Sequence, residues 1–293
     1  MIWKTRTRSL DLTSRAQVMG ILNATPDSFS DGGMHWEISQ ALAQARRMIA
    51  EGAAIIDIGG ESTRPGAAPV AVDEEIQRTV PIITALRAEW VGIISIDTTK
   101  AAVARAALAA GADVVNDVSG LRADAEMASV CARSGCGVVV MHRQGTPACM
   151  QTAPRYREVV GEVKEFFAER LATLTAAGIA EEAQCFDPGI GFGKTLEHNL
   201  ALLRTLGTLA PEGRPVLLGA SRKSFIGKIL GSEELQAREW PTVALTARAR
   251  EMGVMLHRVH SVRKNLESLR MTEAILGPPD RSHDERSSLR SPR

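Results

Sequence analysis

The chain has 293 residues, of which 44% are hydrophobic and 24% are charged, so it is long enough to bury a large core. Its 35 lysines and arginines nearly balance its 34 aspartates and glutamates. This balance excludes the overall charge that would favour nucleic acid or a membrane surface as a partner. Any bound anion must therefore be held by a local cluster.

The cysteines and the amino terminus indicate the compartment. Cys131, Cys136, Cys149 and Cys185 form no CxxC pair and have no histidine at zinc-ligand spacing, which predicts reduced, structural thiols. The first residues, "MIWKTRTRSLDL", lack the apolar segment of a signal peptide, and no run approaches the roughly 20 apolar residues of a membrane span. These features predict a cytoplasmic protein.

Short apolar runs that end in small or polar residues recur along the chain. They lie at 17–25, 53–60, 92–99, 112–120, 137–145, 184–193, 215–223 and 254–262. Helical patterns such as 37–52 and 100–111 separate them, and several end in glycine. Strands that alternate with helices predict a parallel sheet joined by crossovers. The pattern favours an α/β fold with a single domain, a (β/α)8 TIM barrel, with a doubly wound sheet as the alternative.

The predicted barrel domain covers residues 17–276. Residues 1–16 form an N-terminal extension. Residues 277–293, "GPPDRSHDERSSLRSPR", are rich in proline, serine and charge and nearly free of apolar residues, so we expect a disordered C-terminal tail.

Polar residues cluster at the ends of the predicted strands, where ligands bind in both candidate folds. One set combines carboxylates, an amide and an ammonium, which suits a heterocycle with N–H donors and ring acceptors. Its members are Asp97, Asn116, Asp187 and Lys223. A second set suits a phosphate, because arginine presents a planar fork to phosphate oxygens. Its members are Asn23, Arg64, Arg258 and His260. Together they predict a heterocyclic phosphate ester as substrate.

Each of these residues also has a structural interpretation. An aspartate at a strand end more often caps a turn, and Asp97 and Asp117 both fit that role. His142 and His260 taken singly fit structural histidines. The "HRVH" sequence at 257–260 is not a metal pair on a strand, because residues three apart point to opposite faces. No serine–histidine or cysteine–histidine arrangement indicates a nucleophile.

The segment "PGIGFGKT" at 188–195 is similar to a phosphate-binding loop but does not match it. The GxxxxGK[ST] pattern needs glycine at position 188, where proline stands. The glycines instead predict a loop whose backbone approaches a ligand, with Phe192 as an apolar wall.

Several motifs in chain order resemble the dihydropteroate synthase family over residues 17 to 275. They are "NATPDSFSDGG" (23–33), "DIGGESTRPGA" (57–67), "SIDTTK" (95–100), "NDVSG" (116–120), "FDPGIGFGKTLEHNL" (186–200), "SRKSFIG" (221–227) and "RVH" (258–260). The resemblance implies a TIM barrel that condenses 6-hydroxymethyl-7,8-dihydropterin diphosphate with 4-aminobenzoate. It also implies release of diphosphate, a requirement for Mg²⁺, competition by sulfonamides and a homodimer.

Carried over by motif, the resemblance assigns the first polar set to the pterin and the second to diphosphate, with Asn23 near the metal. It implies an aminobenzoate subsite formed by Phe29, Thr63, Pro65, Phe192, Arg222 and Ser224. The residues expected to act in the reaction are Asp31, Arg64, Lys223, Arg258 and His260. The implied mechanism is dissociative: diphosphate leaves, a cation forms at the pterin methylene, and the amine attacks. Residues 23–33 and 61–67 would then close over the site, with Asp27 paired to Arg64 and Asp31 facing the cation.

The chain departs from the family pattern mildly at Ala24, Arg143 and Ala220, and more in 238–262. There Val254 and Met255 replace an Ala-Asp pair and Ser261 replaces an aspartate. Two alternatives stay open: a pterin-domain methyltransferase that binds methyltetrahydrofolate beside a corrinoid, and a paralogue that binds pterin without catalysis.

Overall fold

The computed structural model describes residues 1–24, 34–62, 67–145, 150 and 154–277. Its main strands are β3 (Gln17–Asn23), β4 (Ile55–Gly59), β5 (Ile93–Asp97), β6 (Val114–Asp117), β7 (Gly137–Met141), β8 (Gln184–Asp187), β9 (Leu217–Leu218) and β10 (Leu256–Val259). Its α-helices are α1 (Met34–Ala50), α2 (Val72–Glu89), α3 (Ala101–Ala109), α4 (Met127–Ser134), α5 (Val159–Ala176), α6 (Leu196–Arg204), α7 (Ser224–Leu230), α8 (Glu239–Glu251) and α9 (Val262–Leu276). Short 3-10 helices lie at η2 (Glu181–Ala183), η3 (Leu206–Thr208) and η4 (Gln236–Arg238).

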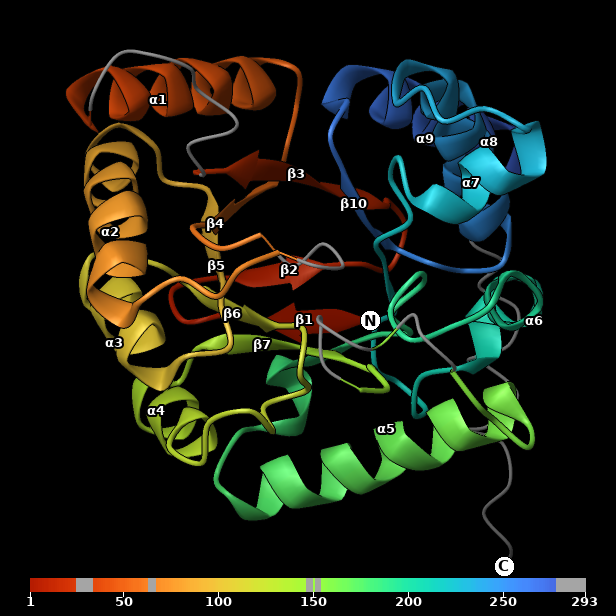
Figure 1. Cartoon of the computed structure of the whole chain (residues 1–293), viewed down its shortest axis with the longest axis horizontal. Helices are drawn as coiled ribbons and strands as arrows, with labels where there is room; N and C mark the ends of the chain where they lie inside the picture. The colour runs from red at the N-terminus through yellow and green to blue at the C-terminus, as the bar shows by residue number, and fades with distance from the viewer. Residues whose placement is uncertain (25–33, 63–66, 146–149, 151–153, 278–293) are drawn as a thin grey trace, which may run out of the picture.

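The eight main strands form one parallel barrel. Their order is β8-β7-β6-β5-β4-β3-β10-β9, so the first strand pairs with the last. A parallel bridge between Phe186 and Val216 joins β8 to β9, and the Phe186 amide donates to the Pro215 carbonyl at 2.9 Å. The helices surround the strands (Figure 1). The barrel prediction is confirmed, and the doubly wound alternative is wrong because an open sheet does not pair its ends.

Several strands of the barrel are buried along their whole length. Every residue of β4, β5, β6 and β7 is buried, as expected for strands covered by helices outside and by side chains within the barrel. The unusual 238–262 segment still supplies α8 and β10. Val254 and Met255 are both buried, so they add apolar core. Ser261 is the N-cap of α9 and makes no side-chain capping bond.

Residues 1–16, predicted as an extension, close the amino end of the barrel. Strands β1 (Ile2–Lys4) and β2 (Ser9–Asp11) pair as an antiparallel hairpin. Trp3 is fully buried, and its indole Nε1 donates to the Ala183 carbonyl at 2.9 Å, directly before β8. The predicted tail lies outside the described residues from position 278.

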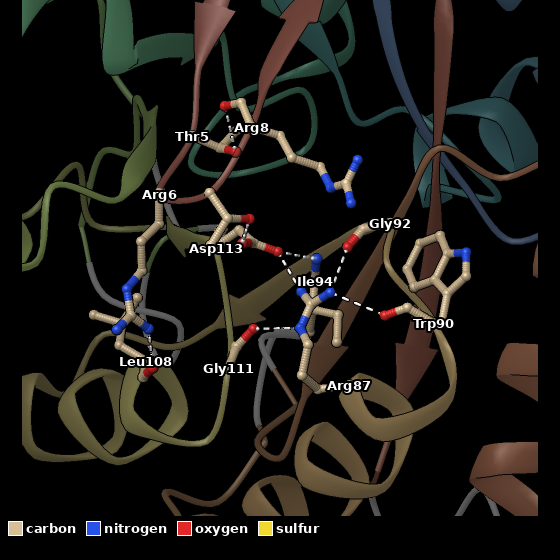
Figure 2. A network of polar contacts seen from close by, with 11 residues as sticks. Thr5, Arg6, Arg8, Arg87, Trp90, Gly92, Ile94, Leu108, Gly111 and Asp113 are labelled. Atoms are coloured by element: carbon tan, nitrogen blue, oxygen red, sulfur yellow. Dashed lines mark hydrogen bonds and ion pairs between the residues drawn. The ribbon is translucent and has the colours of Figure 1, made fainter.

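Arg87, near the end of α2, ties together several loops at this amino end (Figure 2). Its guanidinium donates to the carbonyl oxygens of Trp90 and Gly92 at 2.9 Å and of Gly111 at 3.0 Å. It also forms an ion pair with Asp113, directly before β6. One partly buried cation therefore fixes the loops that enter two neighbouring strands.

The Asp113 carboxylate is fully hydrogen-bonded. Its Oδ2 accepts from Arg87 and from the Ile94 amide at 3.0 Å, and its Oδ1 accepts from the Thr7 hydroxyl at 2.5 Å. We call Arg87, Asp113, Ile94 and Thr7 the amino-end network. It contains a buried charge whose partners all come from the protein.

Cys131, Cys136 and Cys185 are free and buried, as predicted for structural thiols, while Cys149 lies outside the described residues. Within the described part of the chain, no helix combines the length and the apolar character needed to cross a membrane.

Candidate active site

Four polar side chains from four strands meet inside the carboxyl end of the barrel. Arg258 on β10 donates through Nε to Asp57 Oδ2 and through Nη2 to Asp97 Oδ2, each at 2.6 Å. The Asn116 amide donates to Asp57 Oδ2 at 3.0 Å. We call Asp57, Asp97, Asn116 and Arg258 the mouth network.

Strand register explains why these side chains share the inner face. Asp57 pairs with Ser95 on β5, and Asp97, two residues further along, pairs with Asn116 on β6. Because side chains alternate along a strand and paired residues point to the same side, all of these residues face the barrel axis. Asp97, predicted for the heterocycle set, thus reaches the mouth instead of capping a turn.

The mouth network has unused hydrogen-bonding capacity. Asp57 Oδ1 and Asp97 Oδ1 are buried and have no hydrogen-bond partner among the described residues. Burial raises the pKa of Asp97 to about 7, although the charge of Arg258 opposes the shift. Burial lowers the pKa of Arg258, but the charges of Asp57 and Asp97 outweigh it, so the guanidinium stays protonated. Two carboxylates facing one cation form a site that favours N–H donors.

Asp187 and Lys223 lie on the neighbouring wall of the mouth. Asp187 Oδ1 accepts from the Gly189 amide at 2.7 Å, and burial raises its pKa while Lys223 opposes the rise. Lys223 Nζ donates to the Ile190 carbonyl and lies 4.3 Å from the centre of the Phe192 ring. Burial lowers the pKa of Lys223 to about 8. The wall therefore offers a carboxylate, an ammonium and an aromatic face.

Asn23 is the last residue of β3, and His260 directly follows β10. His260 Nδ1 lies 2.9 Å from the Ser221 hydroxyl, which also accepts from the His260 amide at 3.2 Å. The sequence did not indicate this contact, because its two partners come from the separate segments that follow β9 and β10. The prediction that no serine or cysteine acts as a nucleophile stays a prediction. His257 is buried, and its Nε2 contacts the Val254 carbonyl at 3.1 Å, so it faces away from the mouth.

Arg222 and Ser224 lie on the segment that leads into α7. Arg222 forms an ion pair through Nε with Glu239 Oε2 at 2.7 Å. Its φ of 56° is left-handed, a conformation that costs a non-glycine residue about 1–3 kcal/mol and that clusters at functional sites. Ser224 is the exposed first residue of α7. Five other predicted site residues lie outside the described residues: Phe29, Asp31, Thr63, Arg64 and Pro65.

Asp117 behaves as the structural interpretation predicted. Its Oδ1 accepts from the Ser119 amide at 2.6 Å, which closes a turn after β6. Because Asp117 follows Asn116 directly, its side chain leaves the opposite face of the strand. Burial raises the pKa of Asp117 to about 6.

The metal prediction depends on Asn23. Among the described residues, no three histidine, cysteine, aspartate or glutamate side chains come together as a metal cluster. Mg²⁺ needs no such cluster, because it commonly binds one or two protein oxygens together with waters and substrate phosphates. The amide oxygen of Asn23, two strands from Asp97 at the same rim, fits that mode.

Known proteins are similar to this chain in sequence and in fold. The family model described as "Pterin binding enzyme" matches residues 19–260. A curated dihydropteroate synthase from Synechocystis sp. is 47% identical over 265 residues, which cover 90% of this chain and 92% of the relative. The chain belongs to the dihydropteroate synthase family. It is a transferase of folate biosynthesis.

Solved structures of the dihydropteroate synthase family share the same barrel. The Yersinia pestis enzyme in complex with a sulfonamide drug is 44% identical with a TM-score of 0.88, covering 94% of this chain and 99% of the other. The Xanthomonas albilineans enzyme with 4-aminobenzoic acid is 42% identical with a TM-score of 0.88, covering 95% and 99%.

The sequence assigned no role to two residues that lie in or next to the mouth of the barrel. Asp57 lies inside the second apolar run, and its partner Arg258 is 201 positions away, so their contact gives no local signal. Lys194 was hidden inside the glycine-rich motif. The glycines there were expected to let a ligand approach, whereas Gly189 and Gly193 approach the protein backbone instead: a Cβ would lie 1.9 Å from the carbonyl oxygen of His142 and 2.3 Å from that of Gln144.

Proposed function

We propose that this chain condenses 6-hydroxymethyl-7,8-dihydropterin diphosphate with 4-aminobenzoate to give 7,8-dihydropteroate and diphosphate. The observation that carries the proposal is the pair of buried carboxylate oxygens, Asp57 Oδ1 and Asp97 Oδ1, that have no partner among the described residues. A buried acceptor without a donor costs about 1–3 kcal/mol, so a ligand that brings N–H groups recovers that cost. An aminopyrimidinone ring presents such donors along one edge.

The rest of the pterin ring would contact the neighbouring wall. Asp187 would accept further N–H groups, and Asn116 and Lys223 would donate to the ring carbonyl and nitrogen acceptors. Burial makes these bonds stronger than they would be in water. The set Asp97, Asn116, Asp187 and Lys223 therefore remains our assignment for the pterin.

The diphosphate would lie at the rim between β3 and β10. Asn23, His260 and Arg258 would hold it, together with Arg64, which lies outside the described residues. Arg258 uses Nε and Nη2 for Asp57 and Asp97, and Nη1 makes no hydrogen bond within the described part of the chain. Nη1 is therefore available for an anion. Mg²⁺ held by the Asn23 amide oxygen would help to neutralise the charge of the leaving diphosphate.

The aminobenzoate would bind beside Phe192, Arg222 and Ser224, together with Phe29, Thr63 and Pro65, which are not described. Glu239 occupies only Nε of Arg222, so the terminal nitrogens can face a carboxylate. The ring would pack against Phe192. The solved complexes with 4-aminobenzoic acid and with a sulfonamide drug support competition between these ligands at this subsite.

The reaction we propose is dissociative. The bond between the pterin methylene carbon and the diphosphate oxygen breaks, and its electron pair leaves with diphosphate. The amine nitrogen of aminobenzoate then attacks the methylene cation and loses a proton. Preorganised charges at the rim stabilise the leaving group, and closure that excludes water prevents capture of the cation as an alcohol. Asp31 would face the cation in that closed state.

The deciding experiment combines purified protein with both substrates, with and without Mg²⁺. We expect 7,8-dihydropteroate and diphosphate in equal amounts, dependence on Mg²⁺, and inhibition by a sulfonamide that 4-aminobenzoate relieves. Folded protein that binds the pterin in calorimetry without forming product would support the non-catalytic alternative. Binding of methyltetrahydrofolate that pterin diphosphate does not displace would support the methyltransferase alternative.

We also propose that two copies associate through α7, α8 and α9, which carry several exposed apolar side chains. Trp240 is 67% exposed and Ile275 is 73% exposed, and Ile229 and Met271 are exposed on the same group of helices (Figure 1). Large apolar side chains that gather on an exposed surface often mark interfaces. Light scattering should give a dimer for the wild type and a monomer for Trp240→Glu. The free, buried thiols fit our proposal that the enzyme works in the reducing cytoplasm.

A further inference from the structure

A second lysine lies behind the pterin wall and has no role in the reaction proposed above. Lys194 is only 3% exposed. Its Nζ lies 3.0 Å from His142 Nδ1, 3.3 Å from the His142 carbonyl oxygen and 3.1 Å from the Phe192 carbonyl oxygen. A lysine ammonium has three N–H donors, and here three acceptors are within reach.

These acceptors belong to two different loops, one between β7 and α5 and one between β8 and α6. His142 directly follows β7, whereas Phe192 lies in the segment that joins β8 to α6. The same two connections meet again where the Tyr156 hydroxyl donates to the Gly193 carbonyl at 2.9 Å. Gly189 and Gly193 both have positive φ and leave no room for a Cβ against the β7–α5 connection. Lys194 therefore fastens the segment 188–193 to the end of β7.

The fastened segment determines where Lys223 lies. Ile190 supplies the carbonyl that accepts from Lys223 Nζ, and Phe192 supplies the ring beneath it. A Cβ at Gly191 would lie 3.1 Å from Lys223 Cδ, so this backbone also touches the stem of the lysine. A shift of the segment would move Lys223 away from Asp187.

We propose that Lys194 is a positioning residue for pterin binding, which acts by holding the segment 188–193 so that Lys223 faces the pterin ring. The inference rests on the proposed function for the identity of the ligand. Lys194 itself does not touch the substrate in this assignment. It acts through the backbone at Ile190 and Phe192.

The protonation states of the pair are consistent with this role. Burial, together with the charge of Lys194, lowers the pKa of His142 to about 3, so the imidazole is neutral. Where Lys194 is protonated, its ammonium can only donate, so Nδ1 must accept and the imidazole proton must lie on Nε2. Burial lowers the pKa of Lys194 to about 7, with the charge of Asp187 opposing that shift. An apolar side chain of the same length would fill the space but bind neither carbonyl.

The test replaces Lys194 with methionine and measures both substrates separately. For Lys194→Met we expect the Kd for 6-hydroxymethyl-7,8-dihydropterin diphosphate to rise about 10- to 100-fold, the range for losing a hydrogen bond to a charged group. The KM for 4-aminobenzoate at saturating pterin should change less than the pterin Kd, because Phe192 is the only residue assigned to that subsite that lies in the segment held by Lys194.

Arg87→Met is the matched control, because it also removes a cation, here a partly buried one, that binds several carbonyls, at the opposite end of the barrel. This control should unfold at a lower temperature and keep the pterin Kd of the wild type. If Lys194→Met instead matches the control, with lower stability and an unchanged pterin Kd, Lys194 is only a structural residue and the inference is wrong. Equal losses for both substrates would also overturn it.

A measurement on the wild type covers the case in which Lys194→Met does not fold. Nitrogen-15 NMR of the imidazole groups should show His142 with an unprotonated Nδ1 and a protonated Nε2. A proton on Nδ1 at pH 6 would contradict the contact with the ammonium. Failure of the proposed function is separate, because it would show as a wild-type enzyme that forms no dihydropteroate at all.

Discussion

Each end of the barrel pairs a partly buried arginine with buried aspartate, with opposite outcomes. At the amino end, Arg87 and Asp113 satisfy each other, and both oxygens of Asp113 have protein partners (Figure 2). At the mouth, Arg258 faces two carboxylates, and one oxygen of each, on Asp57 and Asp97, has no partner among the described residues. The residue types are alike, so what distinguishes a stabilising network from a binding site is the hydrogen-bonding capacity left over.

This difference has an energetic consequence. When a buried ion pair has complete hydrogen bonding, removing one partner leaves the other charge buried and unpaired. This removal strongly lowers the free energy of unfolding. A buried carboxylate with an unpartnered oxygen is costly in the free protein, and a ligand with N–H groups removes that cost on binding. Mutations in the amino-end network should therefore lower stability, whereas mutations in the mouth network should weaken ligand binding.

Asp113→Asn should give the largest effect. The substitution keeps the shape but removes the charge opposite Arg87, and we expect the free energy of unfolding to fall by about 2–4 kcal/mol. The value lies below that for a fully buried pair because the Arg87 side chain is 26% exposed. Chemical denaturation measures the loss. The pterin Kd of the folded variant should stay within about 2-fold of the wild type. A large change in Kd would show that the two ends are coupled.

Asp97→Asn makes the same substitution in the mouth network. It leaves Asp57 and Arg258 as a balanced pair, so the free energy of unfolding at pH 7 should change by less than about 1 kcal/mol or increase. The pterin Kd should rise about 10- to 100-fold, because a charged acceptor is lost from the ligand site. Calorimetry measures the affinity. A variant that binds pterin as well as the wild type but unfolds more easily would place Asp97 among the structural aspartates.

The barrel could be predicted from the sequence because its signal is repeated. Eight apolar runs in alternation with helices are difficult to produce by chance, and each run contains a strand of the structure. The predicted ends of the strands were less accurate. The run 215–223 yields only Leu217–Leu218 as β9, since Gly219, where a Cβ would lie 3.1 Å from Asp187 Oδ2, already belongs to the mouth. Short strands near a site are shaped by tertiary contacts, which local sequence does not carry.

The site was predictable to the extent that it lies at strand ends. Because ligands bind at the carboxyl ends of barrel strands, we expected Asp97, Asn116 and Asp187 to lie together, and the structure places them at the same mouth. The sequence could not tell that Asp97 turns inward while Asp117 caps a turn, because this depends on register between strands. Nor could it find the contact between Ser221 and His260, whose partners are 39 positions apart. Pairings of this kind need the closed barrel.

The pH dependence of stability is the finest test of the comparison. Burial raises the pKa of Asp97 to about 7, above its value of about 3.9 in an unfolded chain. Between these values the folded state binds more protons than the unfolded state, so stability decreases as the pH rises through that range. From pH 5 to pH 7 we expect the wild type to lose about 1–2 kcal/mol relative to Asp97→Asn, somewhat below the limit of about 1.4 kcal/mol per pH unit for one group. Denaturation of both proteins at the two pH values measures this difference.

The comparison with Asp97→Asn is needed because the pKa values of Asp117 and Asp187 are also raised and add the same pH dependence of stability to both proteins. Identical slopes in the wild type and the variant would mean that Asp97 is already ionised at pH 5. Arg258 would then satisfy it as fully as Arg87 satisfies Asp113, and the two ends of the barrel would differ only in position.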